Sequence, residues 1–206
     1  MMHTALTYEL LAQEQVLDPL SREQWLTLRK LITEMILATD MARHFEIVDT
    51  FRQKYTGRSL PFPKFEDRLS LFRMCVKCAD IAHAGKTEVL HEKWTMQVVQ
   101  EFFHQGDLER QQQLPISPFC DKLTADLPKD QKGFIQGVVK PMFLATNAVI
   151  QSSIIEVTII NQLDVNIEHW KRKAERKKRC SVAPSHPDPE APLVRAVTKV
   201  MTEEGL

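Results

Sequence analysis

Apolar residues recur at helical spacing along most of this 206-residue chain, and this pattern limits its fold more than any other feature. Leu28, Leu31, Ile32, Met35 and Ile36 fall at i, i+3, i+4, i+7 and i+8, which is one apolar face of a helix. We find no convincing segment that alternates apolar and polar residues as a half-buried strand does. Gly occurs only 6 times and aromatic residues make up 7%, which argues against a turn-rich sheet fold. The sequence therefore predicts an all-α fold.

Breaks between the apolar runs divide the chain into about six or seven expected helices. Ser21 followed by Gln24 is a capping-box pattern at a helix start, and Pro141 is expected to kink or end a helix. Residues 55–65, with one Gly and two Pro, form the clearest internal loop. The expected helical segments are residues 4–17, 22–54, 66–83, 90–105, 128–139 and 142–178.

The composition changes at Arg179, after which Pro is mixed with Ser, Asp and Glu. Such a stretch has too few apolar residues to bury a core. We therefore expect one domain over residues 1–178 and a disordered, Pro-rich tail over 179–206.

The charges are balanced, with 27 basic and 27 acidic residues, so nucleic acid is not an expected partner. The most apolar stretch, residues 148–160, is interrupted by polar side chains, and no membrane span is expected. Four Cys in a chain of this length do not make a disulfide framework. A cytoplasmic location is expected, and the basic run 171–179 leaves a nuclear location as an alternative.

Two groups of residues are candidates for chemistry on spacing alone. Asp80 follows a mostly apolar helix and precedes His83, which suits either a metal ligand or an Asp paired with a nearby Lys. Gln131 and Phe134 stand three residues apart, which puts an amide and a ring on one helix face. That pair can clamp a flat heterocycle, and the alternative is a core Phe beside a surface Gln.

The thiols Cys75 and Cys78 form a CxxC pattern. They lie in the middle of an expected helix without a second ligand pair nearby, so they are interpreted as packed or half-exposed thiols.

Five segments together resemble the class I 3′,5′-cyclic nucleotide phosphodiesterases. Among the classes of this family, the segments are most similar to the calmodulin-activated class. The likeness covers about residues 3–143 and extends more loosely to Trp170. It implies a multi-helical bundle of the phosphodiesterase and HD type. The segments are EMILATDMARHF (34–45), CADIAHAGK (78–86), KWTMQVVQEFFHQGDLERQ (93–111), LPISPFCDK (114–122) and DQKGFIQGVVKPMF (130–143).

The resemblance assigns roles to particular residues. Asp80 matches a ligand of the family's catalytic metal pair, zinc with magnesium or manganese. Gln131 matches the purine-binding amide, and Phe134 and Val98 match the apolar clamp on the base. His83 and Met41 match other substrate-pocket positions. The positions that line or support this pocket are Trp94, Thr95 and Phe102.

The chain departs from the family pattern in one large respect, because no His-Asn or His-Asp pair occurs in it. The HNxxHAxD and HD motifs that carry the acid His and the remaining metal ligands are absent. We therefore expect a domain without its N-terminal half, with no catalytic His and only one metal ligand. Such a chain is expected to be inactive and poorly soluble when expressed alone.

The implied function is hydrolysis of cAMP, cGMP or both to 5′-monophosphates, with the cyclic nucleotide as partner and a homodimer left open. His83 and the Gln131 amide do not distinguish the two bases. The alternative is a non-catalytic helical module, derived from a phosphodiesterase, that binds a nucleotide or a partner chain.

Overall fold

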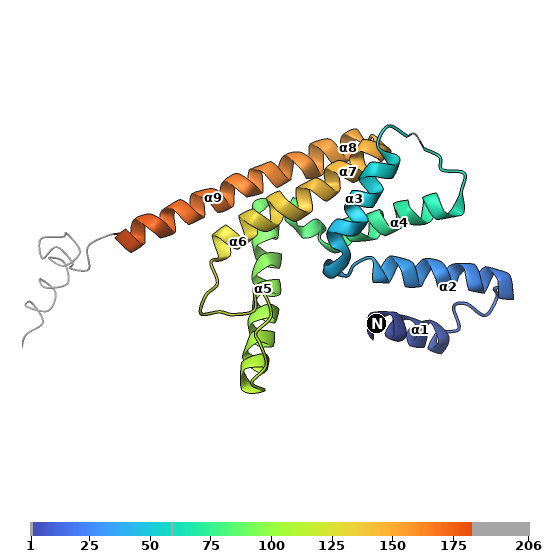
Figure 1. Cartoon of the computed structure of the whole chain (residues 1–206), viewed down its shortest axis with the longest axis horizontal. Helices are drawn as coiled ribbons and strands as arrows, with labels where there is room; N and C mark the ends of the chain where they lie inside the picture. Colours follow the sequence, from blue (N-terminus) through green and yellow to red (C-terminus); the bar gives the residue numbers. More distant parts are fainter. Residues whose placement is uncertain (1, 59, 183–206) are drawn as a thin grey trace, which may run out of the picture. The chain divides into compact units, whose positions relative to one another are not determined.

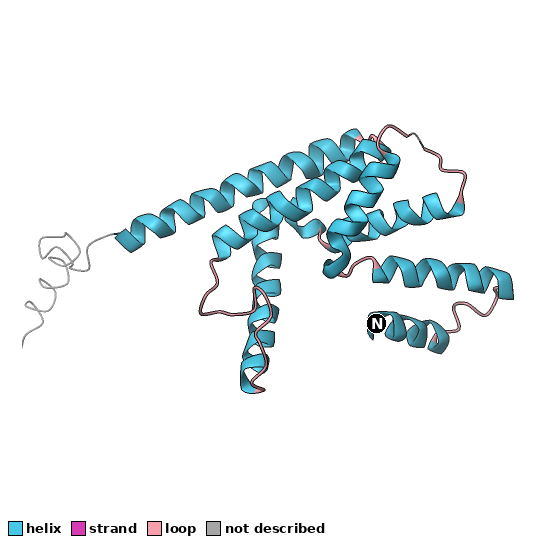
Figure 2. Cartoon of the chain, in the orientation of Figure 1, coloured by secondary structure: helices cyan, strands magenta, loops and turns pink. Residues whose placement is uncertain are grey.

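The structure, a computed structural model, describes residues 2–58 and 60–182, and every regular element in that part of the chain is helical (Figure 1, Figure 2). The prediction of an all-α fold is confirmed. The chain comprises two compact units, Met1–Lys171 and Arg172–Leu206. Of the second unit only residues 172–182, the end of the last helix, are described. The predicted tail therefore lies mostly outside the described residues and stays a prediction.

The helices follow one another with short connections, apart from three longer ones at residues 14–21, 56–64 and 112–126. Their bounds are α1 (Met2–Gln13), α2 (Arg22–Leu37), η1 (Met41–Arg43), α3 (His44–Tyr55), α4 (Phe65–Asp80), η2 (Ala82–Gly85), α5 (Glu88–Gln111), α6 (Leu127–Phe134), η3 (Ile135–Val139), α7 (Lys140–Ile150), α8 (Ser153–Ile155), η4 (Glu156–Ile160) and α9 (Asn161–Val182). η1 and η2 are 3₁₀ turns, whereas η3 and η4 are π-helical.

Helix α2 begins where the capping box predicted it. Gln24 donates its backbone N–H to the Ser21 hydroxyl at 3.3 Å, and Ser21 donates its backbone N–H to Gln24 Oε1 at 2.9 Å. The pair satisfies two backbone donors that the first turn of a helix leaves without partners.

The prediction of one helix over residues 22–54 is wrong, because Asp40 starts a new helical segment inside it. Asp40 Oδ1 accepts the backbone N–H of Ala42 at 2.9 Å, and the 3₁₀ turn η1 leads directly into α3. An Asp side chain competes with the helix for backbone donors, which favours a helix start over a helix interior.

The prediction of one helix over residues 142–178 is also wrong. Gln151 adopts a left-handed conformation with φ of 56°, which ends α7, and its backbone N–H donates to Asn147 O. Ser152 then caps α8 by accepting the backbone N–H of Ile155 at 3.4 Å. Gln151 is not a residue that commonly ends a helix in this way, so the sequence carries little signal for the break.

Pro141, by contrast, does not interrupt its helix, and α6, η3 and α7 run without a break from Leu127 to Ile150. The π turn precedes the proline, and Lys140 donates its backbone N–H to Ile135 O across five residues. A wider turn gives the proline ring the space that a regular α-helix would deny it.

The helix Leu127–Ile150 is long and apolar enough to cross a membrane by length and composition. In the folded unit it supplies core residues, because Ile135, Val139, Met142 and Phe143 are all buried. α7 packs against α3 and α4. The hydrophobic core therefore lies around this helix, which accounts for its apolar character.

Gly106 allows the loop over residues 112–126 to lie directly on α5. A Cβ atom built at Gly106 would stand 2.0 Å from the backbone oxygen of Cys120, whereas a Cβ at Gly133 on α6 would meet nothing within 4 Å. The loop can therefore approach the helix only where the side chain is missing.

We predict that Gly106→Ala lowers the free energy of unfolding by about 1–3 kcal/mol, because the added methyl group overlaps a backbone oxygen. The matched control Gly133→Ala should raise the stability by about 0.5–1 kcal/mol through helix propensity alone. Urea denaturation of both variants measures the difference. An unchanged or higher midpoint for Gly106→Ala would contradict the close approach.

Candidate functional site

His91 lies at the centre of the candidate site, on the first turns of α5, and it is completely buried. Trp170 on α9 donates its indole N–H to His91 Nε2 at 2.7 Å. Because Nε2 accepts this hydrogen bond, the neutral ring carries its proton on Nδ1. This bond fixes both the orientation and the tautomer of His91.

A chain of polar contacts leads from His91 to the candidate base-binding amide. Thr95, one turn along α5, lies 3.5 Å from His91 Nδ1 and donates its hydroxyl to Gln131 Oε1 at 3.5 Å. Both contacts are at the long end of the hydrogen-bond range, so each contributes only weakly to stability. The predicted residues Thr95 and Gln131 are thus brought together, and the residue that supports them, His91, was not predicted.

Burial and, to a lesser extent, the neighbouring His83 ring lower the pKa of His91 to about 4. A hydrogen bond to the His83 backbone acts in the opposite direction. His91 is therefore neutral at physiological pH. A neutral ring is required here, since a protonated Nε2 would face the Trp170 donor.

His83 is placed by the turn η2 rather than by the helix that precedes it. Its ring stacks on His91 with centroids 5.5 Å apart and planes 19° apart. The His83 Nδ1 atom is buried without a hydrogen-bond partner, and burial lowers the pKa of the ring. Asn166 on α9, which is completely buried, holds the turn by donating to Ala84 O at 2.7 Å and to Lys86 O at 2.9 Å.

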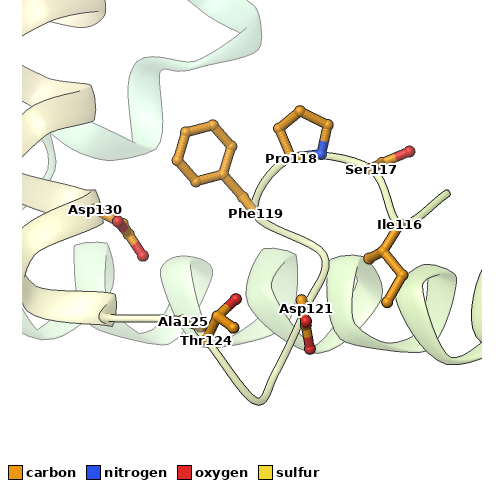
Figure 3. A pocket seen from close by; sticks show the side chains of 8 residues that line it. All are labelled: Ile116, Ser117, Pro118, Phe119, Asp121, Thr124, Ala125 and Asp130. Atoms are coloured by element: carbon orange, nitrogen blue, oxygen red, sulfur yellow. The ribbon is translucent and has the colours of Figure 1, made fainter.

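A hollow of about 380 Å³ opens between the 112–126 loop and the start of α6, and Gln131 is not among the residues that line it. Figure 3 shows Phe119 on the 112–126 loop and Asp130 on α6 facing this hollow. Glu109 on α5 holds the loop by accepting hydrogen bonds from the backbone N–H of Ser117 at 2.7 Å and from its hydroxyl at 2.6 Å. The residues that line the hollow are Ile116, Ser117, Pro118, Phe119, Asp121, Thr124, Ala125 and Asp130.

The remaining predicted residues are more dispersed. Asp80 is the last residue of α4 and is exposed, and Met41, Trp94 and Phe102 are also largely exposed. Val98 is half-buried on α5. Phe134 is half-buried and packs against the hydrophobic core, so part of its ring serves the fold.

Asp80 does not fit a metal pair with the residues present. Among the described residues, the group of His and carboxylate side chains close enough to share an ion is Glu88, Glu92 and His169, and Asp80 is not in it. A tightly held metal needs three or four protein ligands, and one exposed carboxylate supplies one. The i, i+4 spacing of Glu88 and Glu92 was visible in the sequence, whereas no local pattern connects them to His169.

Of the CxxC thiols, Cys78 is buried and Cys75 is exposed, which fits packed or half-exposed thiols. Burial raises the pKa of Cys78 to about 11 and also raises that of Cys75. Cys78 lies 3.4 Å from the Thr146 hydroxyl in the core. A protonated, buried thiol is neither a nucleophile nor a metal ligand at neutral pH.

Comparison with known proteins identifies the family of the chain. The model of the 3′,5′-cyclic nucleotide phosphodiesterase family matches residues 1–160. The chain therefore belongs to the 3′,5′-cyclic nucleotide phosphodiesterase family, and the resemblance read from the sequence is confirmed.

Two curated relatives are equally similar to the chain. It is 36% identical over 149 residues to "3',5'-cyclic-AMP phosphodiesterase 4C" of Mus musculus, which covers 68% of this chain and 22% of the relative. It is 36% identical over 141 residues to "Dual specificity calcium/calmodulin-dependent 3',5'-cyclic nucleotide phosphodiesterase 1" of Drosophila melanogaster, covering 68% of this chain and 16% of the relative. The chain thus spans less than a quarter of either relative, and the identity does not favour the calmodulin-activated class.

We predict that His91 stays neutral, as the Nδ1–H tautomer, until the pH falls to about 4. Because its folded pKa lies below the ordinary value of 6.5, the unfolded chain takes up the proton first as the pH falls. The contribution of the neutral His91 ring to the free energy of unfolding is therefore fully present above pH 6.5. It is lost as the pH falls toward 4.

Ring-nitrogen NMR shifts of His91 across this range measure both the tautomer and the midpoint. Trp170→Phe should raise the midpoint, because it removes the donor that favours the neutral ring. An Nε2–H tautomer in the unmodified chain, or a midpoint near 6.5, would contradict the arrangement.

Proposed function

We propose that this chain forms the purine-binding side of a 3′,5′-cyclic nucleotide phosphodiesterase catalytic domain, and that by itself it binds the nucleotide without hydrolysing it. Membership of the family over residues 1–160 supports the class of ligand. The observation that carries the binding role is the contact between Thr95 and Gln131, supported by the buried His91.

Gln131 is suited to a purine edge because a carboxamide offers both donors and acceptors in one plane. Thr95 donates to Gln131 Oε1, which directs the amide nitrogen away from α5 as a hydrogen-bond donor. The opposite orientation of the amide would place N–H groups against a donating hydroxyl. The hydrogen bond to Thr95 therefore favours one presentation of the amide, while the oxygen keeps a second lone pair for a ligand.

Phe134 follows Gln131 by three residues on α6, so the ring and the amide share a face of the helix. Stacking of a base on an aromatic ring contributes about 1–3 kcal/mol. Because part of the ring packs against the core, its position is fixed before a ligand binds. Val98 on α5 is the residue we propose for the opposite side of the base.

The hydrolytic half of the family's chemistry is not supported by the residues described. Divalent metals supply an activated water or hydroxide to phosphodiesterases. Asp80 alone does not fit such a site, and we derive no step through it. Hydrolysis by this chain is the competing hypothesis, favoured by the family to which it belongs.

We predict that the purified chain binds cAMP, cGMP or both, and that Gln131→Ala and Phe134→Ala weaken binding. The loss of neutral hydrogen bonds should cost about threefold to tenfold, and the loss of stacking about tenfold or more. Isothermal titration calorimetry measures both. Gln136→Ala, at an exposed position on the same helical run, is the control and should bind as the unmodified chain does. Failure of the unmodified chain to bind either nucleotide would refute the proposal.

We predict no turnover of cAMP or cGMP by the same preparation in the presence of Zn²⁺, Mg²⁺ or Mn²⁺. The reason is the shortage of metal ligands around Asp80. Release of 5′-monophosphate, followed by chromatography, is the measurement. Metal-dependent turnover that disappears in Asp80→Asn would establish hydrolysis instead.

A further inference from the structure

Asn166 on α9 is completely buried, and its side chain makes three hydrogen bonds. Its Nδ2 donates one hydrogen to Ala84 O at 2.7 Å and the other to Lys86 O at 2.9 Å, both in or next to the turn η2. Its Oδ1 accepts from Gln162 Nε2 at 3.1 Å, one turn earlier on the same helix. The contacts fix the orientation of the amide, because the flipped group would place Oδ1 against two carbonyl oxygens.

The turn η2 depends on the amide of Asn166 because a 3₁₀ turn holds itself weakly. Hydrogen bonds in a 3₁₀ turn have poorer geometry than those of an α-helix. The bonds of this turn that end at Ile81 O and His83 O are 3.3 and 3.1 Å long, which is longer than both bonds from Asn166. Asn166 therefore fixes the path of a turn that lies 82 residues before it.

Asn166 and Trp170 lie one turn apart on the same face of α9, and each holds one member of a stacked pair of imidazoles. Trp170 donates to His91 Nε2 at 2.7 Å, whereas Asn166 holds the turn that carries His83. The two imidazole rings stack with centroids 5.5 Å apart. One helix thus sets the positions of both rings.

His83 is the member of this pair that a ligand can reach. It is half-buried, whereas His91 is completely buried. The Nδ1 atom of His83 is buried without a partner, so Nε2 is the ring nitrogen left for a hydrogen bond to a ligand. His91 leads through Thr95 to Gln131, the amide that we propose to bind the base. His83 therefore lies next to the residues of the proposed nucleotide site.

We propose that Asn166 is a positioning residue of the nucleotide site, which fixes the turn η2 and thereby holds the His83 ring where it meets the nucleotide. Asn166 acts through His83, because it is itself completely buried. The inference rests on the proposed function, since it takes His83 as part of the nucleotide site. A buried Asn that served the fold alone would change the stability of the chain but not the affinity of folded molecules for a nucleotide.

The first measurement uses the full chain without a nucleotide. NMR spectra give the ring signals of His83, which are identified by their loss in His83→Ala. Asn166→Ala leaves two buried carbonyl oxygens without their donor, so we expect the turn to move. The expected result is a shift of the His83 ring signals and a loss of the nuclear Overhauser effects between the rings of His83 and His91.

Two further variants keep this measurement decisive if Asn166→Ala folds poorly, which circular dichroism checks. Gln162→Ala removes the donor that orients the Asn166 amide, and it should shift the same signals by a smaller amount. Leu163→Ala is the control, because Leu163 is completely buried on α9 and has no donor for the turn. It should lower the stability, as the loss of a core side chain does, and leave the His83 signals in place.

The second measurement is the affinity for cAMP and cGMP, determined by calorimetry in a double-mutant cycle. His83→Ala and Asn166→Ala should each weaken binding by about twofold to tenfold, as the loss of one hydrogen bond does. Because Asn166 acts through His83, the double variant should bind no more weakly than His83→Ala alone. Leu163→Ala should bind as the unmodified chain does.

Unmoved His83 signals in folded Asn166→Ala and Gln162→Ala would overturn the proposal. So would additive losses of affinity in the double variant, or full affinity in Asn166→Ala. Absence of binding by the unmodified chain would refute the proposed function and this inference with it, whereas binding with additive losses would refute the inference alone.

Discussion

The folded unit depends on keeping one buried imidazole neutral. His91 has no exposure to solvent, and it can remain buried because Trp170 satisfies Nε2 while Nδ1 faces Thr95 and the His83 backbone. Burying a charged ring in the same place would cost far more than these contacts return. The same hydrogen bonds join α5 to α9 and orient the amide that we propose to bind the base.

The candidate nucleotide site lies on α5 and α6, whereas the contacts of His169 with Glu88 and Glu92 join α9 to α5. Thr95 points from α5 toward α6, whereas Glu92 contacts His169 on α9. Trp170 lies between the two arrangements, since it contacts both His91 and His169. A change at His169 would thus reach His91 through the buried Trp170 ring.

Local patterns predicted most of the helices and failed at particular residues. Ser21 and Gln24 marked a helix start correctly, because the capping box is formed by residues three apart. Asp40 starts a new helical segment and Gln151 ends α7, although the apolar spacing continues past both, and Pro141 does not end its helix because a π turn precedes it. Of the candidate site, Thr95, Gln131 and His83 were predicted and lie around one centre, but that centre, His91, was missed. It is an inconspicuous His in a helical run, and its partner lies 79 residues away.

The sequence by itself determined the helical class, the family and the residues that share each helix face, because these depend on spacing over a few residues. Only the tertiary structure decided which faces meet. It set the tautomer of His91, left Asp80 exposed, and brought Glu88 and Glu92 to a His 77 residues beyond Glu92. Such contacts arise from the packing of α9 on α5, where long-range burial and hydrogen bonding select among many arrangements that the local sequence permits.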